Sequence, residues 1–74
     1  MKIWVDGDAC PKCIKEILYR VSVRKKITVT IVANKYFYLP QSNTLEMLQV
    51  GDGPDVVDDE ISKRCVTGDL VITA

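Results

Sequence analysis

Apolar and polar positions follow one another along the 74 residues in blocks that suit strands and helices in turn. The first block, Ile3-Trp4-Val5, is a short unbroken apolar run, which is typical of a buried strand. Apolar residues then recur at helical spacing: Cys10, Ile14, Ile17, Leu18 and Val21. With Pro11 near the first helical position, where its missing N–H costs nothing, the pattern predicts a helix over about residues 10–24 that buries this stripe.

The rest of the chain continues this alternation. Residues 27–33 are rich in β-branched side chains and predict a strand that is buried on both faces. Residues 36–43 form a loop, and residues 45–50 suit a further strand, although a helix fits nearly as well. After a break at residues 51–54, an apolar stripe predicts a helix over about residues 55–66, and residues 70–74 predict a last buried parallel strand.

The order β-α-β-β-α-β predicts an α/β fold, a three-layer sandwich around a mostly parallel sheet. Right-handed crossovers place the carboxyl ends of the first two strands side by side. Residues 1–74 are too few for more than one domain. A last strand with no following helix leaves apolar surface uncovered, so we expect a domain truncated at its C-terminus, or a homo-oligomer formed through that strand.

Composition narrows the chemistry. The chain has no histidine, which excludes Ser-His-Asp and Cys-His catalysis and leaves any metal site to carboxylates or thiolates. Its three cysteines, an odd number, argue against a secreted disulfide framework. No apolar run approaches the roughly 20 residues of a membrane span, so we expect a cytoplasmic protein without a membrane partner.

The net charge of zero conceals an uneven distribution. Residues 1–38 hold eight Lys and Arg against three Asp and Glu, whereas residues 39–74 hold two against seven. A nucleic-acid partner would therefore contact only a local basic edge. The alternative is that these basic residues form an ordinary solvent-exposed surface with no binding role. The residues of such an edge are Arg20, Arg24, Lys25, Lys26 and Lys35.

Carboxylates cluster around one edge of the predicted sheet. Asp6 and Asp8 follow the first strand, at the edge where parallel sheets bind ligands. Asp55, Asp58 and Asp59 share one face in the first turns of the second helix, which begins at the same edge. So many anions favour a divalent cation, Mg²⁺ or Mn²⁺, although helix capping and turn formation also explain such residues. Asp69 precedes the last strand at the opposite edge, which predicts a turn residue.

A possible dithiol redox site lies directly after Asp6 and Asp8. Cys10-Pro11-Lys12-Cys13 lies between a strand and a helix, as in thioredoxin- and glutaredoxin-like oxidoreductases, where one thiolate attacks and the other resolves. Those folds also place a cis-proline just before a later strand, and neither Leu39-Pro40 nor Gly53-Pro54 fits that role. Cys10 also belongs to the apolar stripe, which makes a buried structural thiol the alternative. A zinc site is disfavoured, because one CxxC pair has no histidine to complete it.

Four segments taken together resemble the bacterial YaiI/YqxD family. They are Val5-Asp6-Gly7-Asp8-Ala9-Cys10-Pro11, Val32-Ala33-Asn34, residues 53–61 (GPDVVDDEI) and residues 68–74 (GDLVITA). This family has no settled biochemical function. Its fold is PIN-like, and PIN-like domains use clustered acidic residues at the carboxyl edge of a parallel sheet to hold divalent metal for phosphodiester hydrolysis.

The resemblance implies a role for each matching residue. Metal ligands would be Asp6, Asp8, Asp55, Asp58 and Asp59, of which all but Asp55 would be catalytic. Asn34 matches the residue that closes the second strand and would contact substrate; the topology places Lys35 beside it, near Asp6 and Asp8, as a second candidate for that contact. The implied activity is that of a Mg²⁺- or Mn²⁺-dependent nuclease or phosphoesterase that acts on RNA or DNA.

The sequence also departs from the family pattern. Gly7 stands where the family commonly has alanine, and the family continues past residues 72–74 with a further aspartate and a C-terminal portion. The alternatives therefore remain a thiol oxidoreductase that uses Cys10 and Cys13, or a non-catalytic oligomerising fragment.

Overall fold

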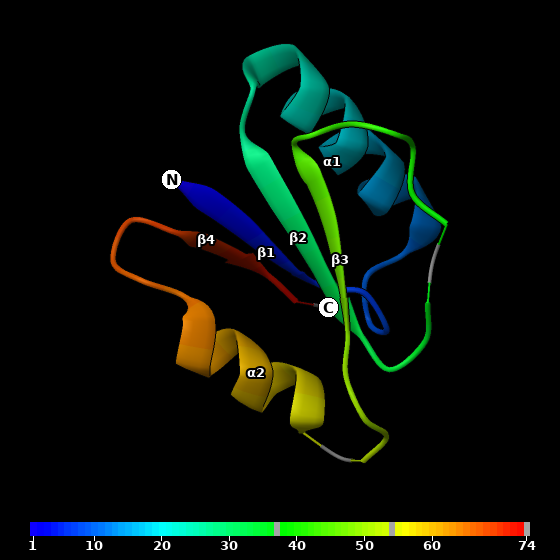
Figure 1. Ribbon diagram of the computed structural model, residues 1–74, viewed down its shortest axis with the longest axis vertical. Helices are drawn as coiled ribbons and strands as arrows, with labels where there is room; N and C mark the ends of the chain where they lie inside the picture. Colours follow the sequence, from blue (N-terminus) through cyan, green and yellow to red (C-terminus); the bar gives the residue numbers. More distant parts are fainter. Residues whose placement is uncertain (37, 54, 74) are drawn as a thin grey trace.

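Four parallel strands form a single sheet in the computed structural model, which describes residues 1–36, 38–53 and 55–73 (Figure 1). The strands are β1 (Lys2–Asp6), β2 (Thr28–Ala33), β3 (Leu45–Gln49) and β4 (Leu70–Ile72). Their order across the sheet is β3-β2-β1-β4, and every pairing is parallel. The predicted element order is thus confirmed, and residues 45–49 form the strand rather than the helix.

Two helices cover opposite faces of this sheet. They are α1 (Lys12–Lys25), which packs mainly on β2 and β3, and α2 (Val56–Arg64), which packs on β1 and β2 (Figure 1). Both are shorter at their N-termini than predicted, because Pro11 is the N-cap of α1 and Asp55 that of α2. The three layers confirm the predicted fold class and are consistent with a PIN-like sandwich. Neither helix in the described ranges has the length and apolarity needed to cross a membrane.

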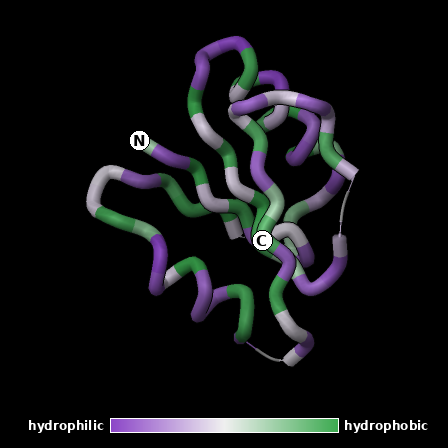
Figure 2. Tube along the Cα trace, in the orientation of Figure 1, coloured by the Kyte–Doolittle hydropathy of each residue, from purple (hydrophilic) through white to green (hydrophobic). Residues whose placement is uncertain are grey.

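The hydrophobic core lies along β1 and β2, the two central strands. Side chains of β1 alternate between the faces: Ile3 and Val5 pack beneath α1, and Trp4 packs beneath α2. Val5 and Ile31 are fully buried. The hydrophobic colours of Figure 2 follow these central strands, as expected where helices cover both faces of a parallel sheet.

The predicted buried stripe of α1 is wrong in part. Ile14, Ile17 and Val21 are 39%, 48% and 36% exposed. The inward face instead carries Lys15 and Ser22, which are both buried, and the half-buried Leu18 and Tyr19. Periodicity identifies the apolar face of an isolated helix, but the position of the helix on the sheet decides which face is covered. Here α1 is rotated about its axis relative to its apolar stripe.

The last strand also differs from the prediction. Leu70 and Val71 are 44% and 40% exposed, because β4 lies at the edge of the sheet and pairs with β1. Its run of Leu, Val and Ile is typical of a buried strand, but at a sheet edge the same side chains are only partly covered. The structure describes this strand over Leu70–Ile72, and Ala74, predicted to belong to it, lies outside the described residues.

Candidate functional site

A shallow hollow of about 220 Å³ lies at the carboxyl edge of the sheet, where β1 and β2 end and α2 begins. Four of its lining side chains are carboxylates. The residues that line it are Asp6, Asp8, Ala9, Asn34, Gly53, Asp55, Val57 and Asp58. The topology therefore brings together acidic residues that are about 50 positions apart in the chain.

Asp6 shapes the turn that leaves β1. Its Oδ1 accepts hydrogen bonds from the backbone N–H groups of Asp8 and Ala9, both at 3.2 Å. The backbone carbonyl of Asp6 also accepts the N–H of Cys10 at 3.0 Å. This carboxylate thus holds the loop between β1 and α1 closed, a structural role typical of aspartate after a strand.

Asp8 joins that loop to the ends of two other strands. Its Oδ2 accepts the backbone N–H of Asn34 at 2.8 Å, just after β2. Asn34 in turn donates its side-chain N–H to the carbonyl of Gly51 at 2.7 Å and accepts a bond from the Gln49 side chain at 3.2 Å. These bonds fix the floor of the hollow, and they engage one oxygen of Asp6 and one of Asp8.

The acidic start of α2 forms the opposite wall. Asp55 is the N-cap and has a left-handed backbone with φ of 63°, yet its side chain makes no capping hydrogen bond. Its carbonyl accepts the N–H of Asp59 at 2.9 Å. Asp58 is exposed and lines the hollow, whereas Asp59 is not among the lining residues. Pro54, predicted to help start this helix, lies outside the described residues.

The carboxylate and amide oxygens of the hollow are suitable ligands for a hard divalent cation, but the described side chains are not close enough together to form a complete coordination site. Carboxylate and amide oxygens are ligands that Mg²⁺ and Mn²⁺ prefer. The ion pairs of Lys2 and Arg64 go to Glu46 and Glu60 rather than to these four carboxylates. Within the described ranges, however, no three His, Cys, Asp or Glu side chains are close enough to hold a metal. A cation bound here would therefore be held by one or two of these carboxylates, with water molecules as its other ligands.

The predicted basic edge is divided between the two ends of the sheet. Arg24, Lys25 and Lys26 lie where α1 ends, near the start of β2. Lys35 follows β2 at the carboxyl edge but is not among the residues that line the hollow. These residues therefore do not form one continuous surface beside the acidic hollow.

The geometry of Cys10 does not favour a reactive thiolate. Its side chain is 6% exposed and precedes α1, and its Sγ is 3.7 Å from the carbonyl oxygen of Pro11. Burial raises the pKa of the Cys10 thiol, which disfavours the nucleophilic form. Cys13 is exposed and Cys65 is half-buried against the core beneath α2. Cys10 thus has the environment of a structural thiol.

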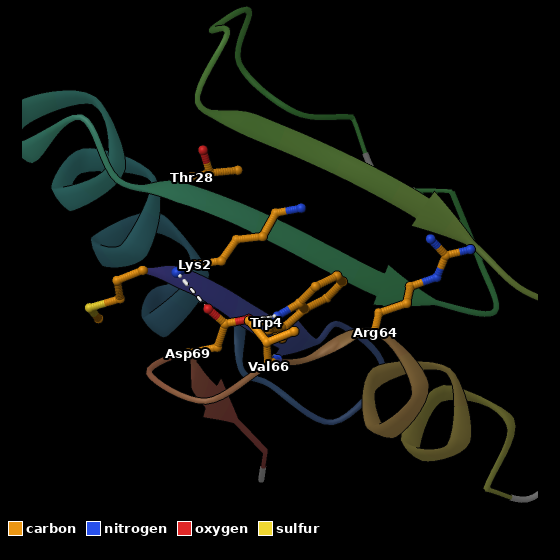
Figure 3. Close-up of a pocket in the computed structure, with 7 residues that line it drawn as sticks. Lys2, Trp4, Thr28, Arg64, Val66 and Asp69 are labelled. Atoms are coloured by element: carbon orange, nitrogen blue, oxygen red, sulfur yellow. Dashed lines mark hydrogen bonds between the residues drawn. The ribbon is translucent and has the colours of Figure 1, made fainter.

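A second hollow, of about 540 Å³, lies at the opposite, amino-terminal edge (Figure 3). The Asp69 carboxylate there accepts the backbone N–H of Lys2 at 3.0 Å and the indole N–H of Trp4 at 2.9 Å. It also accepts the N–H of Val66 at 3.1 Å, and these bonds, led by that of Trp4, lower the pKa of Asp69.

Asp69 therefore lies at the predicted edge, but it does more than make a turn, because it ties β4 to the start of β1. The sequence carries one signal for this role: a buried tryptophan N–H needs an acceptor. The cations of this hollow already have partners, since Lys2 pairs with Glu46 at 3.5 Å and Arg64 with Glu60 at 2.6 Å.

Comparison with known proteins places the chain in a family. Residues 4–74 match the family model described as "Uncharacterized BCR, YaiI/YqxD family". Proteins named UPF0178 from Shewanella sediminis and Shewanella woodyi are each 60% identical over all 74 residues, and one from Maridesulfovibrio salexigens is 53% identical. The chain covers 49% of each of these relatives, so it spans about half their length. No solved structure matches the chain. The chain belongs to the YaiI/YqxD family.

Proposed function

We propose that this chain forms the metal-holding part of a Mg²⁺- or Mn²⁺-dependent phosphodiesterase that acts on nucleic acid. One observation carries the proposal: four carboxylates line one hollow at the carboxyl edge of a parallel sheet. Open α/β sheets bind their ligands at this edge. A cluster of like charges is unfavourable unless a cation neutralises it.

The residues divide into two groups by their contacts. Asp6 and Asp8 are anchored through one oxygen each, which fixes their position and leaves the other oxygen for a ligand. Asp55 and Asp58 lie on the opposite wall, at the first turn of α2. When bound there, a divalent cation supplies an activated water and stabilises the leaving oxygen of the phosphodiester. Asn34, which also lines the hollow, is the side chain that we assign to substrate.

Calorimetric titration of Mn²⁺ tests the metal site. Asp58→Asn is the informative variant, because Asp58 lines the hollow and is exposed. We expect it to weaken Mn²⁺ binding by about tenfold or more, a loss of about 1.4 kcal/mol. Glu16→Gln removes the same charge from an exposed position on α1 and controls for net charge. Equal affinity of wild type, Asp58→Asn and Glu16→Gln would overturn the metal site.

A further variant distinguishes the roles of the neighbouring residues Asp58 and Asp59 in metal binding. Asp59 is not among the lining residues, so Asp59→Asn should bind Mn²⁺ more tightly than Asp58→Asn does. The reverse order would show that the hollow is not where the metal binds.

The hydrolytic step is tested on a full-length relative, because the chain spans about half of that length. The Shewanella sediminis protein should cleave fluorescently labelled single-stranded RNA or DNA when Mn²⁺ is present and stop when EDTA is added. Metal binding without any cleavage would refute the hydrolase and leave the cation site standing.

A further inference from the structure

Helix α1 carries apolar side chains that the core does not use. Ile14, Ile17 and Val21 are 39%, 48% and 36% exposed, although their spacing places them on one flank of the helix. Apolar side chains of this kind are unfavourable in water, so covering them would stabilise a contact. The next question is which part of the sheet this flank of α1 lies beside.

Contacts of the opposite flank of α1 show how the helix is oriented on the sheet. Tyr19 and Val23 line a hollow together with Pro40 and Leu45, so this side of the helix faces β3 and the loop before it. The sheet order is β3-β2-β1-β4, and α1 packs on β2 and β3. The flank of Ile14, Ile17 and Val21 consequently turns toward β1 and β4, where Figure 1 shows no helix on the α1 side.

Strand β4 presents apolar side chains to the same side. Ile72 packs against the core cluster of Ile3 and Val5 beneath α1. Leu70, two positions earlier, points the same way and is 44% exposed. We call Ile14, Ile17, Val21, Leu70 and Ile72 together the α1–β4 face.

We propose that the α1–β4 face is the docking surface for the part of a full-length family protein that lies outside the 74 matched residues. The relatives are about twice as long as the chain, so the unmatched part is about as long as the matched one. Arg24 and Lys25 border Ile17 and Val21 in one hollow, so an acidic group on the docked segment fits that end. The proposal concerns the opposite face from α2 and is independent of the metal site.

The test uses a chimera in which this chain replaces the matched residues of the Shewanella sediminis relative, compared with the 74-residue chain by hydrogen exchange. Amides of residues 12–25 and 70–73 should exchange at least about tenfold more slowly in the chimera. Ile17→Asp should abolish that protection. Val23→Asp, on the opposite flank and 54% exposed, is the matched control and should leave exchange within about twofold of the unmodified chimera.

Three results would overturn the proposal. Equal exchange in the chimera and the short chain would show that the face stays uncovered, and equal effects of Ile17→Asp and Val23→Asp would show that the flank is not specific. A dimer of the 74-residue chain in sedimentation experiments, dissociated by Ile17→Asp, would assign the face to a second copy instead. Because both positions are exposed, circular dichroism should show both variants folded.

Discussion

Ser22 is the polar residue whose removal tests the packing of α1 most directly. It lies on the buried face of the helix and has no exposed surface. Its Oγ is 2.7 Å from the carbonyl oxygen of Ile27 and 3.0 Å from that of Thr44, so its hydroxyl joins α1 to the start of β2 and β3. Replacing it by alanine takes the donor from both carbonyls.

The expected loss follows from these contacts. A single hydroxyl proton serves one carbonyl at a time, and Thr44 keeps a second bond, from the N–H of Val29 at 2.8 Å. The cost is therefore that of leaving about one buried acceptor without its donor, about 1–3 kcal/mol. Only one oxygen atom is removed, so the cavity contribution is small. In a domain of this size, a loss of about 2 kcal/mol lowers Tm by about 8–16 °C.

Urea denaturation measures this loss, with the fluorescence of Trp4, the single tryptophan of the chain, as the probe. Ser62→Ala is the matched control, because Ser62 is exposed on α2 and its replacement should change stability by no more than about 0.5 kcal/mol. If Ser22→Ala is no less stable than Ser62→Ala, the bonds of Ser22 do not hold α1 to the sheet and the packing described above is wrong.

Three further outcomes follow from the structure. Hydrogen bonding, led by the Trp4 indole, lowers the pKa of Asp69 from 3.8. The contribution of Asp69 to the free energy of unfolding is therefore complete above pH 3.8 and is lost as the pH falls through the lower native pKa. In urea denaturation, Asp69→Asn should make the free energy of unfolding depend less on pH in this acid range. Iodoacetamide should modify exposed Cys13 well before buried Cys10, as followed by peptide mass spectrometry, and faster reaction of Cys10 would contradict its raised pKa. Ile31→Val, at a fully buried position, should cost about 0.5–1.5 kcal/mol by the same denaturation assay, and no loss would place Ile31 outside the core.

Much of the candidate site follows from the sequence. Asp6 and Asp8 come directly after an apolar run, and Asp55 and Asp58 open the second helix, so a parallel topology alone places them at one edge. The sequence does not show that Asp6 and Asp8 are also anchored by backbone N–H groups. Nor does it show that Asp58 lines the hollow while Asp59 does not, because neighbouring helical positions differ by about 100° in direction.

From the sequence alone came the family resemblance, the mostly parallel sheet and the element order except at residues 45–50, which fitted a strand or a helix, because strand and helix periods are local properties of a segment. Only the tertiary structure decided which face of α1 is covered, where Ser22 is buried while Ile17 is exposed. It also decided that β4 is an edge strand and that Asp69 ties its start to β1. These features depend on where an element sits against its neighbours, and a pattern along one segment carries no information about that position.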